Sequence, residues 1–174
     1  MEKGFIQVYT GNGKGKTTAA LGLALRAVGH GLRVLMIQFM KGNLSYGELE
    51  SARKLSPYLK IVPMGRQVFV SKSHPDPLDL EHAQDGFSMA KKAIENKEYD
   101  IVILDEINVA IDYGLVPLSD LLHLLESKPQ EVGIVLTGRN AKSEIIERAD
   151  LVTEMVERKH DYDKGIPARK GIEI

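Results

Sequence analysis

The chain has 174 residues, 43% of them hydrophobic, and its 23 lysines and arginines nearly balance its 24 aspartates and glutamates. This length and apolar content predict one globular domain over residues 1–174, and a net charge of -1 gives no general reason to expect nucleic acid or membrane partners. The absence of cysteine excludes disulfides, thiolate metal sites and a cysteine nucleophile, and it fits a cytoplasmic protein.

Short apolar runs alternate along the chain with segments of helical spacing. In chain order, we expect strands at Phe5–Thr10, Arg33–Met40, Lys60–Gly65, Asp100–Glu106 and Val132–Gly138, then one within 151–160 and a short one at 170–174. We expect helices at 16–31, 79–99 and 117–128, and the longest loop at Arg66–Asp79. Several strands are apolar on both faces, as in a parallel sheet covered by helices. The alternation predicts a three-layer α/β fold with a mostly parallel central sheet.

The first junction between strand and helix reads VYTGNGKGKTTAA, from Val8 to Ala20. It is similar to the phosphate-binding pattern G-x-x-x-x-G-K-[ST], but Thr10 stands where that pattern has its first glycine, and the glycine comes one position later. The glycines let backbone amides turn toward phosphate, Lys16 supplies charge, and Thr17 supplies a hydroxyl for Mg²⁺. The residues expected at the triphosphate are Thr10, Gly11, Asn12, Gly13, Lys14, Gly15, Lys16, Thr17 and Thr18.

Two later strand ends carry polar residues suited to the same edge of the sheet. The strand IVILDE ends in Asp105 and Glu106, which can hold Mg²⁺ directly or through water, and its position does not distinguish between the two acids. Arg139 in LTGR can reach phosphate or make a surface salt bridge, and Arg26 in the first helix has the same two interpretations. Together these residues predict a P-loop NTPase fold of the RecA-like kind that binds a magnesium–nucleoside triphosphate.

The order of segments along nearly the whole chain resembles the ATP:corrinoid adenosyltransferases of coenzyme B12 synthesis and salvage. The segments that carry the resemblance are TGNGKGKTTAALGLALRAVGHG, VLMIQFMKG, YGELE, IVILDEIN, VLTGR, ADLVTEM, KH and GIEI. The late glycine of the loop is similar to this family's loop. The resemblance implies that a cob(I) corrinoid attacks the 5′ carbon of ATP and that tripolyphosphate leaves whole.

The resemblance also implies roles for particular residues. Lys16, Thr17 and Glu106 are expected to be catalytic, with Mg²⁺ held by Thr17 and Glu106 and with Asp105 nearby. Lys14 joins Lys16 at the leaving tripolyphosphate, and the resemblance favours nucleotide-site roles for Arg26 and Arg139. Residues expected at the corrinoid are Phe39, Lys41 and Phe69, the last in MGRQVFVSKS, where relatives often carry a tryptophan that this chain lacks. By the same analogy we expect a homodimer and a flavin-dependent reductant protein as partner.

Two other functions fit the nucleotide motifs. A P-loop kinase of a small acceptor needs a base, which Asp105 or Glu106 can supply, and usually an arginine-rich lid, for which HPDPLD is poorly suited. A RecA-like ATPase or nucleotide switch would release ADP and phosphate, and a nucleic-acid motor would need a basic face that the even charge distribution does not indicate. The product distinguishes the three: tripolyphosphate, a phosphorylated acceptor, or ADP with phosphate.

Overall fold

A computed structural model describes residues 3–42, 45–160 and 165–172. Six strands form one sheet in the order β3-β2-β4-β5-β1-β6, and every neighbouring pair is parallel. The strands are β1 (Ile6–Thr10), β2 (Val34–Phe39), β3 (Leu59–Met64), β4 (Ile101–Asp105), β5 (Gly133–Thr137) and β6 (Leu151–Glu154). The helices are α1 (Lys16–Gly29), α2 (Gly47–Lys54), α3 (Pro77–Glu95), α4 (Ile107–Asp112), α5 (Leu118–Ser127) and α6 (Ser143–Arg148).

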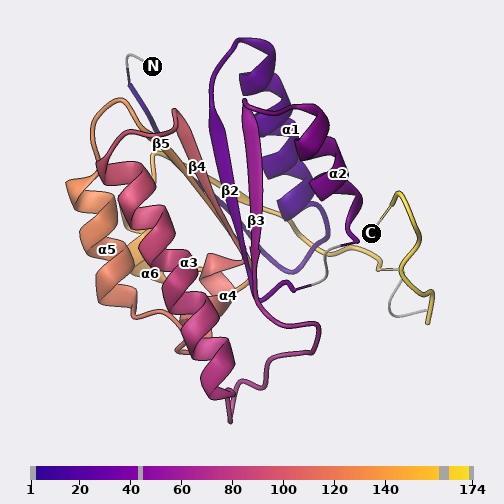
Figure 1. Cartoon of the computed structure of the whole chain (residues 1–174). Helices are drawn as coiled ribbons and strands as arrows, with labels where there is room; N and C mark the ends of the chain where they lie inside the picture. Colours follow the sequence, from indigo (N-terminus) through magenta and orange to yellow (C-terminus); the bar gives the residue numbers. More distant parts are fainter. Residues whose placement is uncertain (1–2, 43–44, 161–164, 173–174) are drawn as a thin grey trace.

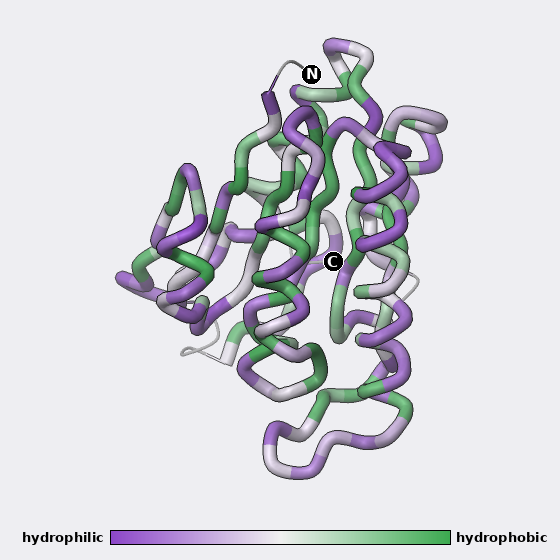
Figure 2. Tube along the Cα trace, turned by 90° about the vertical axis from the view of Figure 1, so that its left-hand side faces the viewer, coloured by the Kyte–Doolittle hydropathy of each residue, from purple (hydrophilic) through white to green (hydrophobic). Residues whose placement is uncertain are grey.

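The sheet lies between two layers of helices, as the apolar strands predicted (Figure 1). Helices α1 and α2 cover one face, while α3, α4, α5 and α6 lie on the other. The hydrophobic segments in Figure 2 run along the strands, and the outer turns of the helices are largely hydrophilic. The predicted three-layer α/β fold with a parallel sheet is confirmed.

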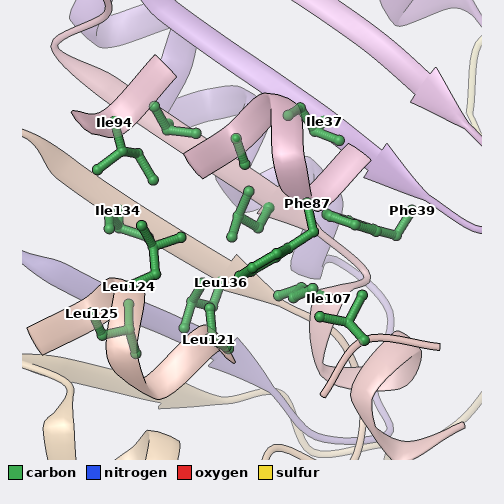
Figure 3. Packing of buried hydrophobic residues seen from close by; sticks show 14 of the residues in the cluster. Ile37, Phe39, Phe87, Ile94, Ile107, Leu121, Leu124, Leu125, Ile134 and Leu136 are labelled. Atoms are coloured by element: carbon green, nitrogen blue, oxygen red, sulfur yellow. The ribbon is translucent and has the colours of Figure 1, made fainter. Parts of the chain in front are cut away.

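Alternate residues of strands β1 to β5 supply two separate apolar cores. On the α3 side, Ile37 and Phe39 of β2 belong to the same core as Phe87 of α3, and this core also includes leucines of α5 (Figure 3). On the other side, Met36 packs under the small residues of α1, including Ala24. The period-two pattern of a strand requires this division, and it fixes which face each β2 side chain can reach.

The predicted elements differ from the structure mainly at their ends. The helix expected at 79–99 begins earlier, at Pro77, because Asp76 caps it and Asp79 completes a capping box. The strand expected within 151–160 is limited to Leu151–Glu154. The terminal strand expected at 170–174 is wrong for residues 170–172, which form a turn, and residues 173–174 lie outside the described ranges. Helices α2, α4 and α6 were not predicted.

A parallel sheet collects the ends of its strands at one edge. Tyr9 of β1 pairs with Thr137 of β5, and Gln38 of β2 pairs with Asp105 of β4. The loops that follow these four strands therefore lie together, where ligands bind in open α/β sheets. Within the described ranges, no helix is both long and apolar enough to cross a membrane.

The segment between β3 and α3 projects beyond this edge as an extended loop (Figure 1). Arg66, at its start, donates to both carboxylate oxygens of the buried Asp79, at 2.7 and 2.8 Å, and also pairs with Asp76 at 3.1 Å. Lys72, at its middle, pairs with Asp112 at 2.7 Å. The predicted long loop is therefore anchored by ion pairs at its base and along its length.

The Arg66 pair predicts a pH-dependent contribution to stability. Hydrogen bonding to Arg66 holds the pKa of Asp79 below its usual value of 3.8. A carboxyl with a lowered pKa stabilises the fold above its unfolded pKa and loses that effect as the pH falls through the folded value. We expect the Tm of Asp79→Asn to lie below that of the wild type at pH 7, and the difference to shrink on acidification from about pH 5 to about pH 2. Asp85→Asn, on the exposed face of α3, is the control, and a gap that widens on acidification would contradict the interpretation.

Candidate active site

The loop between β1 and α1 is shaped by contacts with the chain that follows β6. Met155 donates its amide to the carbonyl of Thr10 at 2.8 Å, and its own carbonyl accepts from the amide of Gly13 at 2.7 Å. A Cβ at Gly11 would lie 2.5 Å from that carbonyl oxygen, and one at Gly13 would lie 2.8 Å from it. Gly11 also has a φ of 91°. The late glycine thus stands where the Met155 backbone leaves no room for a side chain.

This close contact predicts opposite effects at two glycines. Gly11→Ala combines left-handed backbone strain with a backbone clash, and we expect it to lower the free energy of unfolding by about 2–4 kcal/mol. Gly22→Ala, in the middle of α1 with nothing within 4 Å of its Cβ position, should raise it by about 0.5–1 kcal/mol. Urea unfolding of both variants measures the two changes in the free energy of unfolding. Equal effects would show that the Met155 contact does not constrain the loop.

Lys16 lies inside the curve of the loop. Its ammonium donates to the carbonyls of Gly11 and Gly13, at 2.8 and 2.7 Å, and the residue is almost fully buried. Burial lowers the pKa of Lys16 in spite of the nearby Glu106 carboxylate. Gly15 precedes it with a φ of 117° as the N-cap of α1, so the positive end of the helix faces the same space. The loop thus has the charge and the amides of a phosphate cradle.

Arg139, which follows β5, reaches the same loop. Its guanidinium donates to the carbonyl of Asn12 at 3.3 Å, and Gly138 before it has a φ of 125°. The structure therefore brings Arg139 beside the P-loop, as expected from its strand end. Nucleotide contact by Arg139 itself stays a prediction.

Asp105 is the centre of a hydrogen-bond network across four elements. Its Oδ1 accepts from Thr17 at 2.9 Å and from Thr137 at 2.7 Å, while its Oδ2 accepts from Lys41 at 2.7 Å and from Gln38 at 3.5 Å. The residue is fully buried. Asp105 therefore fixes the hydroxyl of Thr17 relative to the ends of β2 and β5.

Glu106 lies next to this network in a strained backbone conformation. Its φ is 64°, and its amide donates to Thr137 at 3.0 Å. Burial raises the pKa of Glu106, and the adjacent Asp105 carboxylate raises it further. The raised pKa and the strained backbone mark Glu106 as a candidate functional residue.

The donor set at this position fits Mg²⁺. Thr17, Asp105 and Glu106 offer oxygen atoms, which are the ligands that hard cations prefer. Gln38, whose amide already contacts Asp105, has a buried Oε1 without a hydrogen-bond partner in the described part of the chain. Within the described ranges, no three His, Asp or Glu side chains are grouped so that they could hold a metal ion by themselves. Phosphate oxygens and water would therefore complete the coordination, as Mg²⁺ usually requires.

A cavity of about 370 Å³ opens beside the Asp105 network. It lies between the end of β2 and the loop that follows β3, and Lys41 forms part of its wall. Phe69 borders it with a fully exposed ring. The lining residues are Met40, Lys41, Gly42, Tyr46, Arg66, Gln67, Val68, Phe69, Val70 and Tyr113.

The structure does not support direct corrinoid contact by Phe39. Its side chain is completely buried and points into the α3-side core, where its ring packs close to Gly86 (Figure 3). The alternation of β2 turns Phe39 to the core, whereas Lys41, after the strand has ended, reaches the cavity. Lys41 and Phe69 are the two expected corrinoid residues that line it.

Arg26 is also placed differently from the expectation. It lies in the last turn of α1, ten residues after Lys16, which corresponds to about 15 Å along a helix axis. There it borders a separate apolar cavity of about 230 Å³ together with Phe5 and His30. A role for Arg26 at the triphosphate is therefore not supported, because the helix carries it away from the loop.

Gln38 and Thr137 are site residues that sequence reasoning missed. Both hydrogen-bond to Asp105, and Gln38 also donates to Glu48 of α2 at 3.1 Å. Each is a polar residue near the end of an otherwise apolar strand, in VLMIQF and GIVLT. A lone polar residue at the last or next-to-last position of a buried parallel strand was the signal available.

The sheet order and the loop define the P-loop NTPase fold. The flagellar accessory protein FlaH from Methanocaldococcus jannaschii has the same fold, with a TM-score of 0.63, 16% identity, and coverage of 88% of this chain and 72% of its own. A KaiC-like protein from Pyrococcus horikoshii has a TM-score of 0.59, 16% identity, and coverage of 90% and 75%. At such low identity the similarity shows the fold alone.

Sequence comparison then identifies the family. The family model described as ATP:corrinoid adenosyltransferase BtuR/CobO/CobP matches residues 2–174. A corrinoid adenosyltransferase from Sinorhizobium sp. is 39% identical, over 99% of this chain and 81% of the relative. One from Escherichia coli K12 is 36% identical, over 99% and 86%. The chain belongs to the corrinoid adenosyltransferase family of transferases.

Proposed function

We propose that the protein transfers the 5′-deoxyadenosyl group of ATP to the cobalt of a reduced cob(I) corrinoid and releases tripolyphosphate. The observation that carries the proposal is the position of Lys41. Its side chain donates to Asp105, which also holds Thr17 at the start of α1, and it lines the 370 Å³ cavity. Direct transfer between two bound substrates requires adjacent sites, and Lys41 forms a wall that the two sites share.

The reaction asks for alignment and charge stabilisation more than for a protein nucleophile. The electron pair of cob(I) forms the cobalt–carbon bond, the bond between C5′ and its phosphate oxygen breaks, and the leaving tripolyphosphate keeps that electron pair. Lys16, the loop amides and Arg139 surround the position where the leaving group would lie. Preorganised positive groups of this kind lower the barrier because charge grows on the leaving group in the transition state.

We further propose that Mg²⁺ accompanies ATP and is held by Thr17 with Glu106 or Asp105. All three supply the oxygen ligands that Mg²⁺ prefers. The cation, when bound, would neutralise charge on the departing phosphates. The protein's own contribution is to fix the Thr17 hydroxyl through its 2.9 Å bond to Asp105.

The cavity beside Lys41 is the proposed corrinoid side. The exposed ring of Phe69 offers an apolar contact to the macrocycle, and Arg66 fixes the base of the loop that carries it. We retain as proposals that a flavin-dependent protein supplies the reducing electron and that the chain acts as a homodimer.

An anaerobic assay of the pure protein tests this function. Mg–ATP and chemically reduced cob(I)alamin are mixed, the corrinoid spectrum is followed, and the phosphate product is identified. Adenosylcobalamin together with tripolyphosphate, both lost in Lys16→Ala, is the expected result. ADP and phosphate without adenosylation of any of several corrinoids would overturn the proposal in favour of a hydrolytic P-loop protein, and a phosphorylated acceptor would indicate a kinase.

A further inference from the structure

Lys41 places a positive charge between two of the oxygen atoms expected to face a metal ion. Its Nζ lies 2.7 Å from Oδ2 of Asp105 and 3.4 Å from Oγ1 of Thr17. Mg²⁺ binds such oxygens at about 2.0–2.1 Å. A cation bound to Thr17 and Asp105 would therefore be close to the ammonium, and the two positive charges would repel each other.

The backbone that carries Lys41 is fixed, so that only its side chain is free to respond. Met40 donates its amide to Met64 at 2.9 Å, which ties the end of β2 to β3. A Cβ at Gly65 would lie 2.6 Å from the amide of Lys41, and one at Gly42 would lie 2.4 Å from the backbone of Arg66. The two glycines thus hold the Lys41 backbone between two close contacts.

The adjacent cavity offers the Lys41 ammonium a second position. Lys41 lines the 370 Å³ cavity, in which the other cationic wall residue, Arg66, is already paired with Asp79 and Asp76. A lysine side chain is long and has four rotatable carbon–carbon bonds, so its ammonium can swing between two partners about a fixed backbone.

We propose that Lys41 is an exchangeable cation: it neutralises Asp105 while no metal is bound, and it moves into the adjacent cavity when a divalent cation arrives with the nucleotide. In the cavity its three N–H donors face the second substrate. Metal–nucleotide binding thereby prepares the cavity, and linkage requires that an occupant of the cavity that binds Lys41 favours metal binding in turn. The exchange rests on the metal site of the proposed function, and the identity of the occupant rests on the proposed transfer reaction.

Metal titration in the absence of corrinoid tests the exchange. Mn²⁺ binding to the full-length chain is measured by electron paramagnetic resonance for the wild type, Lys41→Met and Lys97→Met. The control Lys97 also pairs with a carboxylate, Glu131, but at exposed positions. We expect Lys41→Met to bind Mn²⁺ more tightly by on the order of tenfold, because the competing charge is gone, while Lys97→Met matches the wild type. Unchanged or weaker binding by a folded Lys41→Met would overturn the proposal.

A measurement on the wild type covers the case in which Lys41→Met does not fold. Amine-reactive labelling followed by mass spectrometry reports the accessibility of each lysine in apo protein, with Mg²⁺, and with Mg–ATP. Lys41 should react slowly in the apo protein and several-fold faster in one of the metal-bound states. Equal protection of Lys41 in all three states would show that it stays on Asp105. Neither readout uses adenosyl transfer, so a failed transfer assay and a failed exchange are separate results.

Discussion

Replacing Lys16 by methionine is expected to lower kcat/KM for adenosyl transfer on the order of a thousandfold. The Lys16 ammonium is held within 2.8 Å of two loop carbonyls, inside the curve that would enclose the triphosphate. Methionine has a similar length and no charge, so the shape of the loop is largely kept while the positive charge is removed. Steady-state kinetics with Mg–ATP and cob(I)alamin, together with equilibrium binding of Mg–ATP, measure the effect.

The control is Lys60→Met, an exposed lysine on β3. It removes one positive charge from the chain without touching the loop, and its kinetics should match the wild type. If Lys16→Met instead retained activity within a few-fold of the wild type, the leaving group would not lie in the curve of this loop. The assignment of the P-loop to the tripolyphosphate would then be wrong.

Asp105→Asn is expected to impair stability and nucleotide binding together. The amide keeps the shape of the carboxylate but loses its charge, and its nitrogen cannot accept a hydrogen bond from either of the two donors on that side. Asp105 is fully buried and holds Lys41 at 2.7 Å, so breaking the pair should lower the free energy of unfolding by about 3–5 kcal/mol. Metal-dependent ATP binding should fall at least tenfold, because Thr17 is no longer fixed.

Urea unfolding and calorimetric binding of Mg–ATP measure the two effects in the same preparation. Asp120→Asn is the matched control, since Asp120 is an exposed residue in the first turn of α5. It should change stability by only a few tenths of a kcal/mol. A stable Asp105→Asn that binds Mg–ATP normally would contradict the central position given to Asp105.

The sequence predicted the parallel sheet because its buried strands have a distinctive residue pattern. β2 and β5 are apolar on both faces and end in or beside polar residues, and this pattern has few other interpretations. The short helices α4 and α6 have six residues each, too few for a helical period to be visible. Such helices form because the loops around them are already placed by the sheet.

The candidate site was predictable where a residue's role depends on its position in a motif. Lys16, Thr17 and Asp105 meet because the loop and the strand end share one edge of the sheet. Arg26 and Phe39 lie away from the positions that their motifs suggested. Being next to a motif in the sequence does not fix how far a residue lies along a helix or which face of a strand it is on. The distance along α1 decided the position of Arg26, and the face of β2 decided that of Phe39.

The contact between Gly13 and Met155 also has a consequence for biosynthesis of the protein. The phosphate loop is synthesised before strands β2 to β6, but the carbonyl that holds it belongs to Met155, which follows β6. Until β6 has emerged from the ribosome and paired with β1, the loop lacks this support. A nascent chain can therefore pair its earlier strands before the Met155 carbonyl is in place to hold the loop.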